Sequence, residues 1–597
     1  MSRRLVPWIV LCALLFGSTG CSLFSSPGPQ DALRAFADAL ASRDASAAGA
    51  TTDDPGTATT AITSMFDGMA KDATLTVAVA QPGDDDRTGR LNYSWSFGSN
   101  KTLAYDATAT ATQSGEDWKV HWDTTVLHPK LRPGMTFQYS DDKNYLTPVT
   151  DRDGQPLLTW QTIGVVGLTR EHLDSAAALA EVLRPIDDTI TAESIAGQFA
   201  ATRDDRVTVI KLRQDDLATV ADQLKQIAGV SVTEQGALLT ANRDLSSPAI
   251  DGLPALWQKA VDAGAGWSVT LVSTQGADAG QPTEQLTRTP PGDTPPIRTT
   301  LDIRLQSLAQ QAVAKEARPA VLVAISPSTG GILAAAQNAA ANAQGPIAFS
   351  GSYPPGSTFK TITTAAAITA GLVTPDSPEA CPGTVTVENR TIPNEDEFDL
   401  GTVPLSTAFA KSCNTTMAAL ADRLPADALP NTARLFGIGV DYVIPGLTTI
   451  TGNVPNADTP AQKVENGIGQ GTVTVSPFGL AVAEASLGHG STITPTLVVG
   501  ENTTANTASQ PIPGPVAADL RAMMSQTIAD GTATALQDVP GLGGKTGTAE
   551  FGDNTHSHGW FAGIAGDIAF ATLVVGGDTS TPAVAVTGDF LRPAVAG

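Results

Sequence analysis

A proline–glycine turn followed directly by an apolar helical pattern is the feature that most constrains this chain. Residues 353–360 read Tyr-Pro-Pro-Gly-Ser-Thr-Phe-Lys. Consecutive prolines do not fit inside a helix, so the chain must turn before Ser357. Over residues 358–370 apolar side chains recur at helical spacing, and Gly371 follows as a stop signal. The pattern places Ser357 at a helix N-terminus, one turn before Lys360.

This placement has chemical consequences for the serine and the lysine. Free N–H groups at a helix N-terminus stabilise a developing oxyanion. Residues three apart share one helical face, so we expect Lys360 to point at Ser357. A serine hydroxyl is a poor nucleophile until a base removes its proton, and a lysine is a base only when burial or a nearby cation lowers its pKa. Lys545 is the cation that we expect there.

Two later segments complete the pattern. Ser412-Cys413-Asn414 lies between two apolar helical runs, and Lys545-Thr546-Gly547-Thr548 follows a glycine-rich stretch. Alone, the first would be an ordinary helix cap and the second an exposed strand with a glycine bulge. Glycine at 547 would let a substrate backbone lie against the strand. Their order after Ser357 gives both segments a shared interpretation.

The order Ser-x-x-Lys, Ser-x-Asn, Lys-Thr-Gly resembles that of enzymes that acylate a serine with a D-Ala-D-Ala peptide or a β-lactam. Thr300-Leu301-Asp302, residues 467–471 (Gly-Ile-Gly-Gln-Gly) and residues 558–561 (His-Gly-Trp-Phe) extend the resemblance to class B penicillin-binding proteins. The strand patterns around residues 321–335 and 545–575 predict a five-stranded antiparallel sheet flanked by helices. The predicted fold class is α+β multidomain, with this sheet in the C-terminal domain.

The resemblance implies a role for each site residue. Ser357 would be the nucleophile, Lys360 its base, and Ser412 the relay that protonates the leaving amine. Asn414 would bind the substrate amide, while Lys545 and the hydroxyls of Thr546 and Thr548 would bind the terminal carboxylate. Gly547 would admit the substrate, and the N–H groups of residues 357 and 548 would form the oxyanion hole. Residues 469–471 would line the cleft, with His558 and Trp560 as sheet residues beside it.

The implied function is a peptidoglycan D,D-transpeptidase that cross-links stem peptides through an acyl-enzyme on Ser357 and is inhibited by β-lactams. A D,D-carboxypeptidase, and a β-lactam sensor that binds without turnover, remain as alternatives. A class A β-lactamase is disfavoured, because no Glu-x-x-Leu-Asn occurs between residues 412 and 545. The expected partners are stem peptides, β-lactams and cell-wall synthesis proteins. Neither a cofactor nor a metal is expected.

The N-terminus and the charge bear on location. Arg3 and Arg4 precede an apolar run over residues 5–16, which is shorter than the roughly 20 residues of a membrane span. Ser-Thr-Gly-Cys21 follows and resembles a bacterial lipobox, although Ser18 stands where an aliphatic residue is usual. We expect lipidation at Cys21 and attachment to the outer face of the cytoplasmic membrane; an uncleaved apolar anchor is the alternative. The net charge of −24 argues against nucleic acid as a partner.

Two of the four cysteines lie outside this leader. Cys381 and Cys413 form an even pair in an oxidising compartment and could be joined as a disulfide. Two separate buried thiols are the other interpretation. Cys413 would face away from the cleft, which fits a bridge to Cys381.

Composition shifts divide the chain into successive regions. A helical start followed by alternating strands resembles the N-terminal, nuclear-transport-factor-two-like (NTF2-like) domain of methicillin-resistance-type penicillin-binding proteins. The mixed region after Asp151-Arg152-Asp153-Gly154 resembles a pedestal or dimerisation domain. The predicted boundaries are a signal peptide with lipobox at 1–21, a tether at 22–30, the NTF2-like domain at 31–148, the pedestal domain at 149–281, a proline-rich linker at 282–298 and the transpeptidase domain at 299–597.

Overall fold

The computed structural model describes residues 28–80, 85–98, 100–552 and 555–596. The predicted signal peptide and Cys21 lie outside the described residues, as does most of the tether. The chain forms two compact units. The first comprises residues up to 144 together with 264–293, and the second comprises 145–263 together with 294–597.

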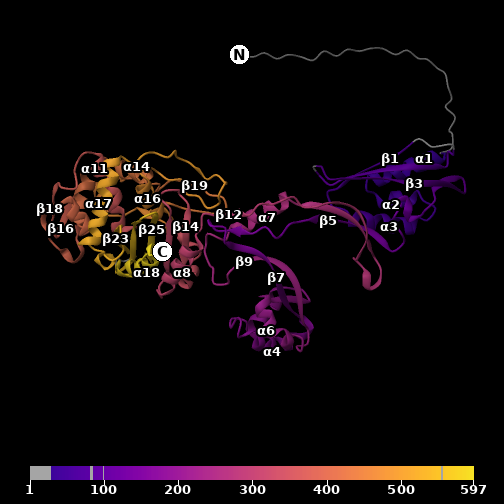
Figure 1. The fold of residues 1–597 in the computed structure, drawn as a ribbon, viewed down its shortest axis with the longest axis horizontal. Helices are drawn as coiled ribbons and strands as arrows, with labels where there is room; N and C mark the ends of the chain where they lie inside the picture. Colours follow the sequence, from indigo (N-terminus) through magenta and orange to yellow (C-terminus); the bar gives the residue numbers. More distant parts are fainter. Residues whose placement is uncertain (1–27, 81–84, 99, 553–554, 597) are drawn as a thin grey trace, which may run out of the picture. The chain divides into compact units, whose positions relative to one another are not determined.

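The first unit begins with helices packed on an antiparallel sheet (Figure 1). Its helices are α1 (Pro29–Ala41), α2 (Ala45–Ala50) and α3 (Pro55–Gly68). The sheet runs in the order β1 (Thr74–Val79), β2 (Thr88–Ser96), β3 (Thr102–Ser114), β4 (Asp117–Val120). Leu33, Phe36 and Leu40 are fully buried, as the helical spacing predicts, and share a core with Trp95 on β2.

A second sheet in this unit corrects two predicted boundaries. It consists of β5 (Met135–Asp142), β10 (Gly266–Ser273) and β11 (Pro282–Thr289), with β10 in the middle. Residues 266–273, expected in the pedestal domain, therefore pair with the N-terminal region. The linker prediction was wrong for residues 282–289: Pro282 opens an edge strand, where its missing N–H is tolerated, and the other prolines of this stretch follow the strand.

The second unit begins with the region predicted as the pedestal. Its mixed sheet runs β12 (Ile297–Arg298), β6 (Val149–Thr150), β7 (Pro156–Thr169), β8 (Arg206–Arg213), with β9 (Val230–Thr240) also paired to β7. The helices of this region are α4 (Ala176–Leu183), α5 (Ala192–Ala201), α6 (Gln214–Leu224) and α7 (Leu253–Ala263).

The C-terminal part of this unit contains the predicted five-stranded antiparallel sheet. Its order is β14 (Ile332–Gln337), β13 (Ala320–Ile325), β25 (Ile568–Val574), β24 (His556–Ala565), β23 (Leu542–Phe551). Both predicted hairpins are confirmed, and the strand that carries Lys545 pairs with β24. Strand β23 is an edge strand, so one of its sides is open to another segment.

Helices cover both faces of this sheet (Figure 1). Along β13, alternate side chains enter two different cores: Leu322 packs in the core that α8 (Ile303–Ala314) and α18 (Thr581–Val595) share, and Val323 packs in the core of the opposite face. The opposite face is covered by α16 (Pro477–His489) and α17 (Gly514–Ala529), and α11 (Lys360–Thr369) packs against α17. The fold class predicted from the sequence is confirmed.

Shorter elements complete the C-terminal part of this unit. They are α9 (Ala339–Asn342), α10 (Ile347–Ser350), β15 (Pro378–Cys381), β16 (Thr384–Val387), β17 (Arg390–Pro393), β18 (Gly401–Pro404), α12 (Leu405–Ala410), α13 (Asn414–Arg423), α14 (Ala428–Leu435), β19 (Tyr442–Val443), β20 (Gly452–Asn453), α15 (Pro460–Gly467), β21 (Thr474–Val475) and β22 (Thr504–Ala505). Two single-turn 3₁₀ helices used below are η4 (Gly356–Phe359) and η5 (Glu395–Glu397). Within the described part of the chain, no helix has the length and apolar character needed to cross a membrane.

Candidate active site

The turn that carries Ser357 is built by close backbone contacts. Gly356 has a φ of +53° and donates its N–H to Gly469 O at 2.9 Å. A Cβ on Gly356 would lie 2.4 Å from Thr548 O, and a Cβ on Gly469 would lie 2.0 Å from Gly356 O. Both contacts are far inside van der Waals range, so glycine is required at both positions. Residue 469 therefore lies directly beside the nucleophile turn, as predicted for a segment that lines the cleft.

Strand β23 closes the other side of this turn. A Cβ on Gly547 would lie 2.8 Å from Pro355 O and 2.9 Å from Thr358 Cγ2. Trp560, fully buried on β24, donates its indole N–H to Pro354 O at 3.0 Å. The expectation for Gly547 therefore needs correction: the space that its missing side chain leaves is filled by the nucleophile turn itself.

Lys360 begins α11 and is fully buried. Its Nζ lies 2.7 Å from Ser412 O, 2.5 Å from Asn414 Oδ1 and 3.2 Å from Ser412 Oγ. Across the described residues, Ser357 Oγ has no hydrogen bond to Lys360 Nζ or to any other group. The expected direct Ser357–Lys360 contact is thus absent here, because the amine is held by the acceptors of the Ser-x-Asn segment.

These contacts limit where the protons can lie. Ser412 O and Asn414 Oδ1 can only accept, so each takes an N–H from Lys360. A neutral amine then has one lone pair left, which can accept the proton of Ser412 Oγ. Lys545 Nζ donates to that same hydroxyl at 2.9 Å. The contacts fit an uncharged Lys360 that accepts from Ser412 Oγ, and also an ammonium that donates to it; in both cases Lys545 donates to Ser412 Oγ.

The electrostatics favour this uncharged state. Burial, and then the positive charge of Lys545, hold the pKa of Lys360 well below its usual value. Burial also lowers the pKa of Lys545, to about 7, while the Glu395 carboxylate acts in the opposite direction on both lysines. Lys545, the neighbouring cation expected from the sequence, is present. Burial lowers the pKa of Lys360 more than the charge of Lys545 does.

The Ser-x-Asn turn joins α12 to α13. Ser412 adopts a left-handed conformation, with a φ of +63°, which is uncommon for a residue with a side chain. Asn414 uses both ends of its amide: Nδ2 donates to Pro393 O at 2.8 Å and Oδ1 accepts from Lys360. The side chain expected to bind a substrate amide therefore also positions the base.

Lys545 and its neighbours form the opposite wall. Lys545 is fully buried, donates to Thr546 O at 3.1 Å and lies 5.8 Å above the ring of Phe409. Thr546 is buried, with its hydroxyl 2.6 Å from that of Thr532. Thr548 is half-buried and its hydroxyl has no hydrogen bond within the described chain. Of the two threonines, Thr548 is the one with an available hydroxyl.

Backbone directions on β23 fit an oxyanion hole. Thr546 O faces Lys545 Nζ and Thr548 O faces Gly356, so both carbonyls point away from β24. In a strand, the N–H and C=O of one residue point to the same side, so the Thr548 N–H is also directed at the nucleophile turn. The Ser357 N–H lies in the first turn of η4, where N–H groups have no partner inside the helix.

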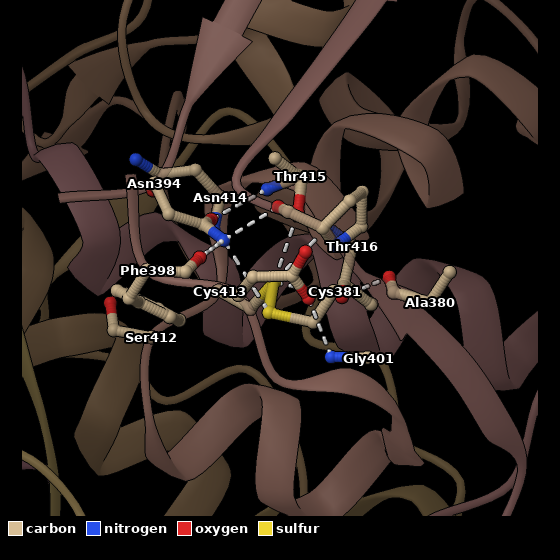
Figure 2. The surroundings of a disulfide bond; sticks show 12 residues. Ala380, Cys381, Asn394, Phe398, Gly401, Ser412, Cys413, Asn414, Thr415 and Thr416 are labelled. Atoms are coloured by element: carbon tan, nitrogen blue, oxygen red, sulfur yellow. Dashed lines mark hydrogen bonds between the residues drawn. A yellow bond between two sulfur atoms is a disulfide. The ribbon is translucent and has the colours of Figure 1, made fainter. Parts of the chain in front are cut away.

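Cys381 and Cys413 are bonded to each other, behind the Ser-x-Asn turn (Figure 2). Both residues are fully buried. The side chain of Asn394 lies beside the disulfide and contacts the start of α13. Asn394, Glu395 and Phe409 were not identified from the sequence. An asparagine and a glutamate in a polar turn are ordinary loop residues, and nothing in their spacing marks them.

No group of three or more His, Cys, Asp or Glu side chains that could hold a metal ion occurs among the described residues. The site residues are instead hydroxyls, amines, an amide and backbone N–H groups. Groups of these kinds can serve as nucleophile, base, proton relay and oxyanion donors in acyl transfer.

Comparisons with known proteins agree with this geometry. Residues 320–592 match the penicillin-binding protein transpeptidase domain, and residues 28–135 match an NTF2-like N-terminal transpeptidase domain. The chain is 32% identical over 334 residues to the peptidoglycan D,D-transpeptidase PbpA of Mycobacterium tuberculosis, which covers 47% of this chain and 67% of that protein. It is 32% identical over 309 residues to PbpA of Mycolicibacterium smegmatis, covering 43% of this chain and 62% of that one.

A more distant relative matches over a greater length. Penicillin-binding protein 3 of Bacillus subtilis is 23% identical over 522 residues, which is 76% of each chain. The similarity thus extends beyond the transpeptidase domain to the N-terminal half. With these matches and the residues that surround Ser357, the chain belongs to the class B penicillin-binding proteins, with an NTF2-like N-terminal domain and a C-terminal transpeptidase domain.

Proposed function

We propose that this protein is a serine-type peptidoglycan D,D-transpeptidase that works through an acyl-enzyme on Ser357. The observation that carries the proposal is the shared hydroxyl of Ser412, which lies within hydrogen-bonding distance of both Lys360 and Lys545. That chain of three groups gives the site a neutral base and a path for the proton that the base collects.

In the acylation step, Ser357 Oγ attacks the carbonyl carbon of the penultimate D-Ala. Its proton passes to the neutral Lys360 amine; catalytic hydrogen bonds that are absent in a free enzyme commonly form with substrate. The N–H groups of Ser357 and Thr548 stabilise the oxyanion. The proton then moves through Ser412 to the departing nitrogen, which leaves as D-Ala, and the C–N bond is replaced by a Ser357 ester.

In the second step, an amine of another stem peptide attacks the ester. Its extra proton returns along the same path to Ser357 Oγ, and the free enzyme is regenerated. Lys545 would supply positive charge, and the free hydroxyl of Thr548 a hydrogen bond, to the terminal carboxylate of the donor peptide. A β-lactam would acylate Ser357 in the same way and deacylate slowly.

The remaining parts support the catalytic domain. We assign catalysis to residues 299–597 and a pedestal role to residues 149–263. The substrate lies outside the cytoplasm, and we propose a lipid anchor at Cys21 on the outer face of the membrane. Replacement of Cys21 with alanine should abolish acyl-chain incorporation and release the protein, whereas unchanged membrane partition would favour an apolar anchor.

The test is intact-mass spectrometry after incubation with a D-Ala-D-Ala thioester analogue, with and without a D-amino acid acceptor. We expect a mass adduct on the wild-type protein and an acceptor-dependent product. Product that forms equally without acceptor would identify a D,D-carboxypeptidase. An adduct without turnover would identify a β-lactam-binding sensor, and absence of an adduct would refute the assignment of Ser357.

A further inference from the structure

Helix α13, which carries Asn414 at its start, lacks an oxygen cap of its own. The first N–H groups of a helix need partners from outside it, and Ser, Thr, Asp or Asn usually supply an oxygen at the capping position. Here that position is Cys413, whose sulfur is part of the disulfide. Of the backbone N–H groups in the first turn, the sulfur accepts only that of Thr416, at 3.5 Å; the hydroxyls of Thr416 and Thr415 lie 3.0 Å and 3.1 Å from it.

Asn394, from a distant segment, satisfies the N–H groups that the cysteine leaves open. Its Oδ1 accepts from Asn414 N at 2.8 Å and from Thr415 N at 3.1 Å. Its Nδ2 donates to Pro382 O at 2.9 Å and to Phe398 O at 2.8 Å. The side chain is 2% exposed, so water does not compete for these bonds. Figure 2 shows the amide between the disulfide and the first turn of α13.

The same segment also holds the side chain of Asn414. Pro393, directly before Asn394, accepts from Asn414 Nδ2, while Asn414 Oδ1 accepts from Lys360 Nζ. Backbone and side chain of Asn414 are thus fixed by neighbouring residues of one strand end. The turn before Asn414 needs such support, because Ser412 adopts a left-handed backbone conformation that is unfavourable for a residue with a side chain.

We propose that Asn394 is a positioning residue of the active site, which places Asn414, and through it the Lys360 amine, by capping α13 from outside. This inference rests on the proposed acylation of Ser357. Asn394 Oδ1 thereby influences the rate at which Ser357 is acylated, although it touches neither Ser357 nor the substrate.

The chain offers a matched control. Asn338 is also buried in the transpeptidase domain, accepts from Ala320 N and Ala341 N, and donates to Glu316 O and Arg318 O. It caps α9 and contacts no residue of the site. Asn338→Leu and Asn394→Leu therefore each remove two bonds accepted from backbone N–H groups and two donated to backbone carbonyls in one domain; Asn394→Leu also removes the 3.5 Å contact of Nδ2 with Cys381 Sγ.

The experiment measures the acylation rate constant with a fluorescent penicillin, well below each variant's melting temperature. We expect Asn394→Leu to react at least about tenfold more slowly, and Asn338→Leu at the wild-type rate despite a similar loss of melting temperature. Equal rates for the two variants would overturn the proposal. Failure of the wild-type protein to react would instead refute the proposed function.

A second variant separates positioning from folding. Asn394→Asp keeps an acceptor for both N–H groups. It also adds a negative charge beside the backbone of Asn414, the residue whose side chain accepts from Lys360. An opposite charge favours the ammonium form, so the pH at which acylation reaches half its maximum should rise. We also expect this variant to react faster than Asn394→Leu. A pH profile that superimposes on the wild-type profile, or a rate no better than that of Asn394→Leu, would contradict the proposal.

Discussion

The two walls of the site are held in place by different kinds of contact. On the nucleophile side, backbone meets backbone: Gly356, Gly469 and Gly547 bring the turn against β23 and the 467–471 loop with no room for a side chain. On the Ser-x-Asn side, side chains and a disulfide connect α13 to residues 380–398. The first wall should respond to any added atom, whereas the second should be adjustable by polar substitution.

The largest effect should follow removal of the nucleophile. We expect Ser357→Ala to lose all labelling by fluorescent penicillin while retaining its melting temperature, because Ser357 Oγ makes no hydrogen bond in the described structure that folding would miss. Ser352→Ala, an exposed serine of the same segment, is the control and should label normally. Labelling that persists in Ser357→Ala would show that another residue is acylated.

A single methyl group should disable the backbone wall. Gly547→Ala would place its Cβ 2.8 Å from Pro355 O. We expect a loss of about 1–3 kcal/mol in the free energy of unfolding and a decrease in acylation rate of about 100-fold. Gly514→Ala, where a Cβ meets no atom within 4 Å, should be neutral in both melting and labelling assays. A Gly547→Ala protein with normal kinetics would mean that the turn can move without cost to the chemistry.

Loss of the disulfide should have a smaller and partly recoverable effect. Removing the Cys381–Cys413 bond should lower the free energy of unfolding by about 2–4 kcal/mol. The pair Cys381→Ala with Cys413→Ser should be more stable than Cys381→Ala with Cys413→Ala by about 0.5–2 kcal/mol, because serine provides the oxygen cap that cysteine lacks. Denaturant titration measures both. Equal stability of the two pairs would imply that the Thr416 N–H gains nothing from an oxygen acceptor in place of sulfur.

The smallest effect concerns charge at the rim. The carboxylate of Glu395 raises the pKa of Lys360 and of Lys545. Acylation needs Lys360 without its proton and, for the substrate carboxylate, Lys545 with one, so the rate should rise and then fall with pH. Glu395→Gln should lower both pKa values and shift the whole profile to lower pH, by a small amount because salt screens an exposed charge. Rates across pH 5–9 test this; a shift to higher pH would contradict it.

Much of the catalytic domain could be predicted from the sequence, because the patterns that indicate its elements involve residues close together in the chain. The proline–glycine turn, the spacing after Ser357 and the alternating strands each depend on a few neighbouring residues. The hydrogen-bond partners of the Lys360 amine could not be predicted, since they lie about 50 residues away in sequence. Gly547 was assigned to substrate entry because a sequence shows that a side chain is missing, but does not show what fills the space.

The linker boundary was predicted wrongly for a related reason. Residues 282–289 contain a proline and polar residues and were assigned to a linker, yet they form an edge strand beside β10. Edge strands tolerate proline and polar side chains, so their composition overlaps with that of loops. Only the partner strand distinguishes the two, and that partner lies in another part of the sequence.

The crowding of Gly356, Gly469 and Gly547 has an evolutionary consequence. Variants that survive antibiotic selection must keep a working cell-wall enzyme, and none of these three positions can gain a carbon without displacing a carbonyl. Resistance substitutions in this protein should therefore accumulate among half-exposed side chains that border the cleft. The three glycines should remain invariant in surviving strains.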